Sequence, residues 1–312
     1  MMKRKYNILV TGSGGDIGQS IGKILTKIGY NTFGLDISPN NPARFIFDNF
    51  DTFLNVKDPK YIAQLKEFIS VNKIDLVIPA SEAELRFFTK DKTLETNFNN
   101  VKLIMANSYS RIVGFDKIKT CNFLEKNNLL FPEIYTNAKD AIYPCIAKPR
   151  IGSGSSNIFI VSNKEEFYFI SRKYKDIFFQ ELLNDNNGEY TSCVYRTFDK
   201  NIRHITFRRE LSSGYSSFGE LVSMDEIDNL LYSIAEKIDL KGSINVQFRF
   251  HKGRPVVFEI NPRFSSTVLF RHLMGFRDLE WSISEALGNS IGDYKKPEIG
   301  TKFYKGYNEY VI

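Results

Sequence analysis

The chain has 312 residues with a formal net charge of +6, and 42% of its residues are hydrophobic and 25% charged. This length allows two domains and a well-buried core, and the composition is ordinary for a soluble globular protein. No apolar run approaches the ~20 residues that a membrane span needs, and the run Ile8-Leu9-Val10 is too short for a signal peptide. Cys121, Cys145 and Cys193 lie far apart and indicate neither a disulfide framework nor a zinc site, so we expect a cytoplasmic protein without a membrane partner.

The surplus of basic residues does not by itself indicate nucleic-acid binding. Lys and Arg are scattered along the chain, without a basic arm or a recognition motif. Anionic small molecules such as nucleotides and carboxylates explain the bias equally well. We therefore expect small-molecule partners and no nucleic acid.

Strands alternate with helices in the first third of the chain. Apolar residues recur at helical spacing over residues 17–28 and 61–69, and short apolar strands are predicted at residues 6–11, 31–36, 75–79 and 101–105. Such alternation predicts a parallel, doubly wound sheet, and we assign residues 1–108 to this α/β domain.

After residue 108 the pattern becomes that of an α+β region with two lobes. For the first lobe, residues 109–185, we predict helices at 116–127 and 164–172 and strands at 143–148, 158–161 and 177–181. For the second, residues 186–312, we predict a helix at 225–238, antiparallel strands at 192–198, 202–208, 243–250 and 256–260, and an edge strand at 303–312.

A glycine turn follows the first predicted strand. Thr11-Gly12-x-x-Gly15-x-x-Gly18 precedes a helix, and Asp36 ends the next strand, as in dinucleotide-binding folds. A short-chain dehydrogenase would also need Tyr-x-x-x-Lys on one helical face, and Tyr135 with Lys139 is the one match. We predict that Thr136 caps a short helix over residues 137–142, which leaves Tyr135 outside it. Nicotinamide chemistry at this turn therefore stays a minor alternative.

The stretch from Val256 to Thr267 carries the clearest chemical pattern. Glu259, Asn261 and Arg263 alternate at a strand end, so their side chains leave on one face. A carboxylate, an amide oxygen and a guanidinium together suit a hard cation and a phosphate. A strand ended by Pro262 with a surface ion pair is the alternative explanation.

Two further segments fit a nucleotide site. Lys148 ends a strand and precedes a glycine- and serine-rich turn, which suits a triphosphate or, alternatively, is a flexible hairpin with a solvated lysine. The strand edge at Glu181 and Leu183 suits an adenine, which needs a backbone C=O and N–H. The nearby carboxylate of Glu189 suits ribose hydroxyls or, alternatively, is a solvated carboxylate after a strand.

The order of these elements resembles the ATP-grasp superfamily, most closely the synthetase halves of the carbamoyl-phosphate synthase large chain and their stand-alone relatives. The likeness covers nearly the whole chain and implies a Rossmann-like pre-ATP-grasp domain followed by a two-lobed ATP-grasp domain. It rests on Lys117, Lys148, the Gly/Ser turn, residues 180–183, Glu189, Gln247 within 242–247, and Glu259-x-Asn261-x-Arg263.

The resemblance implies a role for each of these positions. Glu181 and Leu183 would bind adenine, Glu189 the ribose, and Arg263, together with Lys148, would be catalytic by holding the transferring phosphoryl group. The ATP phosphates would be bound by Lys117, Lys148, Ser153, Gly154, Ser155 and Ser156. Mg²⁺, with Mn²⁺ as a substitute, would be held by Gln247, Glu259 and Asn261.

For the substrate acid the candidate cationic partners are Arg203, Arg208 and Arg209, on and after the strand at 202–207, and we choose Arg208. Ser265 and Ser266 stand where the family often has glycines, and we assign them to substrate binding as well. Residues 302–309 resemble the tails of stand-alone ligases associated with cell-surface polysaccharide synthesis. This likeness indicates a sugar acid or an amino acid as substrate.

The sequence thus predicts an ADP-forming ligase that joins a small-molecule carboxylate to an amine through an acyl phosphate. Positioning and charge neutralisation would do most of the catalysis. The resemblance also implies a homodimer paired through the N-terminal unit. An NAD(P)-dependent oxidoreductase or epimerase, and a non-catalytic nucleotide sensor, remain the alternatives.

Overall fold

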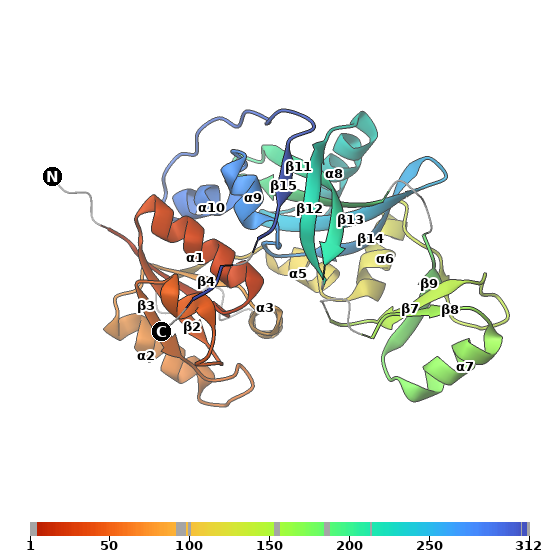
Figure 1. Cartoon of the computed structure of the whole chain (residues 1–312), viewed down its shortest axis with the longest axis horizontal. Coiled ribbons are helices and arrows are strands. Elements are labelled where there is room, and N and C mark those ends of the chain that lie inside the picture. Colours follow the sequence, from red (N-terminus) through yellow and green to blue (C-terminus); the bar gives the residue numbers. More distant parts are fainter. Residues whose placement is uncertain are drawn as a thin grey trace.

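A five-stranded parallel sheet forms the first third of the computed structural model, which describes residues 5–91, 98, 101–152, 157–183, 188–212, 214–306 and 308–310 (Figure 1). Its strand order is β3-β2-β1-β4-β5, with every pair parallel. The doubly wound α/β prediction is therefore confirmed. The strands are β1 (Asn7–Thr11), β2 (Asn31–Asp36), β3 (Asn49–Thr52), β4 (Leu76–Pro79) and β5 (Lys102–Leu103).

The helices α1 (Asp16–Ile28), α2 (Tyr61–Val71) and α3 (Glu82–Lys90) connect these strands, with a 3₁₀ turn at Pro42–Phe45. Our prediction missed β3 and α3. Strand β3 is a mostly exposed edge without alternating apolar residues, and α3 is short and starts with two glutamates. We also predicted β5 too long, because only Lys102 and Leu103 pair with β4.

A four-stranded antiparallel sheet with the order β6-β9-β7-β8 forms a small lobe, at the right of Figure 1. It follows α5 (Ser108–Gly114) and α6 (Lys117–Lys126), and it comprises β6 (Ile134–Tyr135), β7 (Cys145–Pro149), β8 (Phe159–Val161), α7 (Lys164–Lys173) and β9 (Ile177–Glu181). The predicted helix over residues 137–142 is wrong. The side chain of Asn137 accepts from the backbone N–H of Lys139 at 3.0 Å, and this turn replaces the first helical bonds.

A six-stranded antiparallel sheet with the order β14-β13-β10-β11-β12-β15 forms the large lobe. Its strands are β10 (Glu189–Arg196), β11 (Ile202–Ser212), β12 (Tyr215–Val222), β13 (Gly242–His251), β14 (Arg254–Asn261) and β15 (Lys302–Tyr304). Its helices are α8 (Asp225–Lys237), α9 (Val268–Leu273) and α10 (Asp278–Ala286). No helix in the described part of the chain is long and apolar enough to cross a membrane.

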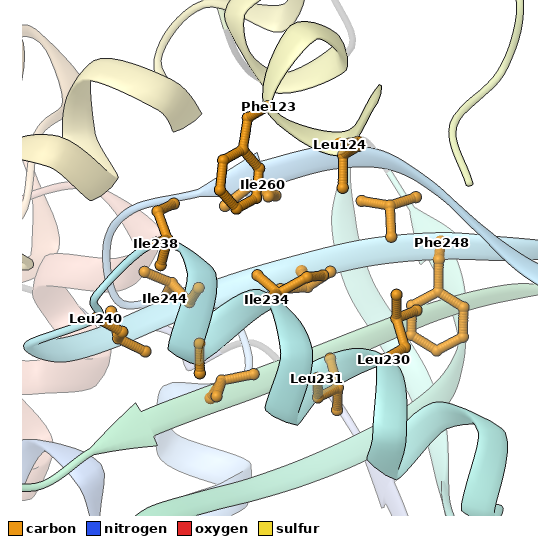
Figure 2. Packing of buried hydrophobic residues seen from close by; sticks show 14 of the residues in the cluster. Phe123, Leu124, Leu230, Leu231, Ile234, Ile238, Leu240, Ile244, Phe248 and Ile260 are labelled. Atoms are coloured by element: carbon orange, nitrogen blue, oxygen red, sulfur yellow. The ribbon is translucent and has the colours of Figure 1, made fainter. Parts of the chain in front are cut away.

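The core of the large lobe lies between α8, α6 and this sheet (Figure 2). The buried residues of α8 recur at helical spacing, so one stripe faces the strands. Leu231 and Ile234 are fully buried against residues such as Ile244 and Ile260. Each such side chain contributes about 1.5–3 kcal/mol of burial, and this packing holds β13 and β14 rigidly.

The last residues do not form the long edge strand that we predicted. Strand β15 pairs with β12 only over Lys302–Tyr304, and residues 307, 311 and 312 lie outside the described part. The chain then leaves the sheet, because the ammonium of Lys305 contacts the carboxylate of Asp16 and the ring of Tyr310 stacks on Phe45 at 4.8 Å. We call residues 302–310 the C-terminal strap. It joins the large lobe to the N-terminal domain, where Figure 1 places the end of the chain.

Candidate active site

One cleft of about 1060 Å³ lies between the N-terminal domain, the small lobe and the large sheet. It brings together predicted residues that are distant in sequence. The residues from our prediction that line it are Lys117, Lys148, Glu181, Leu183, Glu189, Gln247, Glu259, Asn261, Arg263, Ser265 and Ser266. Ser153, Gly154, Ser155 and Ser156 lie outside the described residues.

The floor of the cleft is the end of the β13–β14 hairpin. Gln247 pairs with Glu259 and Asn245 with Asn261, so the four side chains form two cross-strand rows facing the cleft. The Gln247 amide donates to the Asn245 Oδ1 at 3.1 Å, and the Asn245 amide donates to the Thr191 hydroxyl at 2.7 Å. Sequence reasoning missed Asn245, although it stands two residues before Gln247 on the same strand face.

The floor offers oxygen ligands suited to Mg²⁺, but not a complete cage. Within the described residues, no group of three or more His, Cys, Asp or Glu side chains is placed to hold a metal. Glu259 supplies one carboxylate, and Gln247 and Asn261 supply amide oxygens. Mg²⁺ commonly binds one or two carboxylates together with substrate phosphates. The residues present therefore fit a metal ion that is bound together with a nucleotide.

Two lysines face this floor. The Lys148 ammonium donates to the Phe258 carbonyl at 3.4 Å, and the Lys117 ammonium donates to the Gly152 carbonyl at 2.7 Å and lies 3.6 Å from Glu259. Burial lowers the pKa of Lys148 to about 8, although nearby Glu259 opposes the shift. The protein therefore compensates little of the positive charge on the buried Lys148 ammonium. This is expected of a cation whose function is to bind an anionic ligand.

The start of helix α6 holds Lys117 in place. Asp116 caps the helix by accepting from the backbone N–H of Ile118 at 3.1 Å, and Arg150 binds both Asp116 oxygens at 2.8 and 2.7 Å. These contacts keep the pKa of Asp116 below its ordinary value, with the Arg150 hydrogen bond the main lowering influence against burial. The bidentate pair also fixes the chain just after Lys148.

Apolar side chains and a strand edge form the side of the cleft in the small lobe. Ile158 and Ile160 on or beside β8 line it, as do Glu181 and Leu183 at the end of β9. The Glu181 backbone N–H donates to the Glu133 carbonyl at 2.8 Å, so this donor is already used within the lobe. The slot suits a flat apolar group such as a purine base, with Leu183 rather than Glu181 as the candidate for a backbone donor.

Glu189 lies between two arginines on neighbouring strands. Arg209 donates to its Oε1 at 2.6 Å and Arg249 to its Oε2 at 3.0 Å. These three bonds, counting a second from Arg209 at 3.1 Å, leave about one of its four acceptor positions for a ligand hydroxyl.

Our choice of Arg208 is wrong as a residue of the cleft. Its side chain is 53% exposed, pairs with Glu220 at 3.2 Å and does not line the cleft. Successive residues of a strand point to opposite faces, so the buried neighbour Arg209 faces the cleft in its place. The sequence Phe207-Arg208-Arg209-Glu210 does not reveal which arginine faces inward without the phase of β11.

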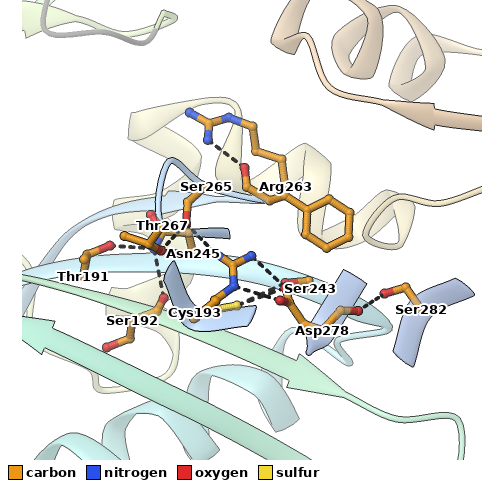
Figure 3. A network of polar contacts seen from close by, with 12 residues as sticks. Thr191, Ser192, Cys193, Ser243, Asn245, Arg263, Ser265, Thr267, Asp278 and Ser282 are labelled. Carbon is orange, nitrogen blue, oxygen red and sulfur yellow. Dashed lines mark hydrogen bonds and ion pairs between the residues drawn. The ribbon is translucent and has the colours of Figure 1, made fainter. Parts of the chain in front are cut away.

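A buried polar network supports the segment after the floor (Figure 3). Arg271 binds both oxygens of Asp278 at 2.8 Å and donates to the Ser265 and Thr267 hydroxyls at 2.9 and 3.1 Å. Arg263 points away from this network and donates to the Phe264 carbonyl at 3.0 Å. Burial lowers the pKa of Arg263, while Glu82 and Glu259 oppose the shift. The network thus holds Ser265 in place and leaves the Arg263 guanidinium facing the cleft.

The N-terminal glycine turn lines the same cleft from the opposite side. A side chain at Gly12, where φ is +65°, would meet Ser81 at 2.8 Å, and one at Gly18 would meet the Gly12 carbonyl at 2.4 Å. The Asp36 carboxylate accepts from the backbone N–H of Gly14 at 2.8 Å and of Ser38 at 3.1 Å. Asp36 therefore holds the turn itself, and the turn faces the phosphate floor across the cleft.

Comparisons with known proteins agree with this geometry. Residues 115–267 match the ATP-grasp domain family, and residues 8–104 match the PylC-like N-terminal domain family. The formate-dependent phosphoribosylglycinamide formyltransferase of Wigglesworthia glossinidia brevipalpis is 21% identical over 84% of this chain and 70% of its own length. The carbamoyl phosphate synthase large chain of Clostridium botulinum (strain Kyoto / Type A2) is 25% identical over 96% of this chain but only 31% of its own.

The fold also has solved counterparts. An N5-carboxyaminoimidazole ribonucleotide synthetase, solved as its ADP complex, superposes with a TM-score of 0.75 at 15% identity, over 97% of this chain and 81% of the other. At this identity the likeness concerns the fold.

Proposed function

Because the chain belongs to the ATP-grasp family, with a PylC-like N-terminal domain, we propose that it is an ADP-forming ligase that joins a small-molecule carboxylate to an amine through an acyl phosphate. The observation that carries this proposal is one cleft in which Lys117, Lys148 and Arg263 face the oxygen atoms of Glu259 and Asn261. Cations beside a magnesium-type ligand set suit transfer of a phosphoryl group to a carboxylate.

Each part of the cleft has a task in this reaction. The apolar slot beside Leu183 holds the base, and Glu189 accepts from ribose. Lys117 and Lys148 neutralise the phosphates, and Arg263 holds the phosphoryl group as it moves. Bound Mg²⁺, at Gln247, Glu259 and Asn261, would supply charge neutralisation to the phosphate oxygens.

The acid substrate belongs at the junction of the large lobe and the N-terminal domain. Arg209, Ser265 and Ser266 line this part of the cleft. A sugar acid or an amino acid has the size and hydroxyl or ammonium groups that such a polar surface can bind. The likeness of residues 302–309 to ligases of cell-surface polysaccharide synthesis supports the same substrate class.

The test is ADP release with Mg·ATP across a panel of sugar acids and amino acids, each paired with a panel of amines. We expect one pair to stimulate ADP formation. Glu259→Ala should lower the stimulated rate by about 10³-fold or more, because it removes the only carboxylate of the floor. Glu67→Ala, on the exposed face of α2, is the charge-matched control and should keep the full rate. Full activity of Glu259→Ala, or no stimulation by any pair, contradicts the proposal.

A further inference from the structure

Glu84 lies at the point of the N-terminal sheet where a ligand is expected. Strands β1 and β4 are neighbours, and the chain continues from β1 to one side of the sheet and from β4 to the other. In such sheets the crevice outside the carboxyl ends of these two strands is the usual binding place. Glu84 stands in the first turn of α3, directly after β4, and it lines the cleft beside Thr11 and Gly12.

The Glu84 carboxylate is bound by hydroxyl groups. The Tyr61 hydroxyl donates to Oε1, and the Ser81 hydroxyl donates to Oε2 at 2.7 Å. Only 6% of the residue is exposed, and no cation lies within ion-pair distance in the described part of the chain. Burial raises the pKa of Glu84, as does Asp36, whereas the hydrogen bonds from Tyr61 and Ser81 oppose the shift.

The other glutamates of the cleft each have a basic partner. Arg86 binds Glu82 at 2.8 Å through its Nε, Arg209 binds Glu189, and Lys117 faces Glu259. His251 lies 3.2 Å from Glu181. Glu84 differs from them in that its charge is not matched by the protein.

Helix capping explains the position of Glu84 but not its charge. Ser81 is the N-cap residue of α3: its hydroxyl accepts from the Glu84 backbone N–H at 3.2 Å and donates to the Glu84 carboxylate at 2.7 Å. The cap bond itself uses only the backbone N–H of residue 84, so it does not require a carboxylate there. The helix cap therefore does not explain why a carboxylate without a basic partner is buried at the cleft wall. A chemical role would explain it.

We propose that Glu84 is the base that accepts a proton from the amine substrate, an inference that rests on the proposed ligase function. An ammonium group at the β1–β4 crevice gives one proton to Glu84. The freed nitrogen lone pair then forms the C–N bond as the acyl phosphate C–O bond breaks. Phosphate leaves with the electron pair of the broken C–O bond and takes the second proton from the nitrogen. The products are the amide, hydrogen phosphate and protonated Glu84.

Hydroxylamine separates this step from the formation of the acyl phosphate. It is unprotonated at neutral pH and attacks acyl phosphates without a base, whereas an alkyl ammonium must first lose a proton. The experiment uses the carboxylate found in the ADP-release screen and measures two products with the full chain. One is the hydroxamate formed with hydroxylamine, and the other is the amide formed with the amine substrate.

Glu84→Gln keeps the cap and the side-chain shape but cannot accept the proton. We expect amide formation to fall by about 10²-fold or more and hydroxamate formation to change by less than about threefold. Glu67→Gln, an exposed change on α2, is the matched control and should alter neither product.

Three results would overturn the inference, and each has its own meaning. If Glu84→Gln forms amide at the wild-type rate, Glu84 is not the base. If it loses both products equally, Glu84 has a structural role. If the wild-type chain itself forms no hydroxamate with any carboxylate, the ligase proposal fails, and this inference fails with it.

Discussion

Two sets of buried charges, one beside the cleft floor and one beneath the segment that follows it, differ in how completely they are paired. Arg271 and Asp278 are almost fully buried, at 0% and 1% side-chain exposure, and meet in a bidentate pair with bonds of 2.8 Å. Lys148 is also buried, but among the described residues its ammonium has only the Phe258 carbonyl, at 3.4 Å, as a hydrogen-bond acceptor. Lys117 lies 3.6 Å from Glu259.

The difference separates charges that stabilise the fold from charges kept for a ligand. In the first set every charged hydrogen-bonding group has a geometrically good partner, so removing one partner leaves the other uncompensated. In the second set neither cation has a close ion pair: Lys148 has a long bond to a carbonyl, and Lys117 donates to the Gly152 carbonyl at 2.7 Å but lies 3.6 Å from Glu259. An incoming triphosphate would complete their charge pairing. Four predictions test whether this division is correct.

The largest expected effect on stability is at Asp278. Asp278→Asn should lower the free energy of unfolding by about 3–5 kcal/mol, because Arg271 would remain buried without its counter-charge. Urea unfolding measures this change. Asp239, which pairs with Arg196 at 2.7 Å on the surface, gives the matched control. Asp239→Asn should lower the free energy of unfolding far less, because solvent screens an exposed pair, and equal losses for both variants would contradict the division.

Lys148→Met should weaken nucleotide binding without lowering stability, in contrast to Asp278→Asn. We expect Mg·ATP affinity to fall by about 10²-fold, since a cation facing the phosphates is lost. The melting temperature should stay the same or rise, because a desolvated charge is replaced by an apolar side chain. Calorimetric titration and thermal unfolding measure the two quantities. Lys139→Met, on an exposed turn, is the control; a large loss of stability in Lys148→Met would place Lys148 with the structural set.

The lowered pKa of Lys148 predicts that the protein takes up a proton when it binds the nucleotide. With its pKa lowered to about 8, free Lys148 loses its proton at mildly alkaline pH, and a bound triphosphate would restore it. Mg·ATP affinity should therefore decrease as the pH rises above about 8. Because the unfolded lysine holds its proton to higher pH, the contribution of Lys148 to the free energy of unfolding increases with pH between about 8 and 10.5.

Titrations at one pH in buffers of different ionisation enthalpy give the number of protons taken up. We expect uptake near pH 8.5 in the wild-type chain and none from this position in Lys148→Met. Identical uptake by the two proteins would assign the proton to another group.

The smallest expected effect is at Arg208. Its pair with Glu220 is exposed, so Arg208→Met should change stability by less than about 0.5 kcal/mol and leave the carboxylate-stimulated rate nearly unaltered. Arg209→Met should lower that rate, because Glu189 would keep Arg249 alone as its partner. Steady-state ADP release distinguishes the two variants, and a reversed order would contradict the observed phase of β11.

The sequence predicted the parts of this molecule that depend on local pattern. Alternation located Glu259 and Asn261 on one face of β14 and brought Arg263, just beyond the strand, to the same cleft. Apolar spacing located α1 and α8. Whether the side chains of Arg209 and Asn245 face the cleft depends on which face of each strand is turned inward. Tertiary packing decides this, and the local sequence does not. Helix α3 was missed because its short apolar stripe is masked by charged residues, and Glu84 was missed with it. The Arg271–Asp278 pair joins two helices that we did not predict, so no spacing in the sequence indicated it.

The C-terminal strap has a consequence for how the chain folds. Lys305 and Asp16 are separated by 289 positions. Closing a flexible loop of this length costs roughly 5 kcal/mol of chain entropy, more than a single ion pair near the surface is expected to return. This contact can therefore persist only after the intervening sheets have already brought the two segments together. A spectroscopic probe placed beside Tyr310 and Phe45 would accordingly report the final step of assembly, when the strap docks on a finished N-terminal domain.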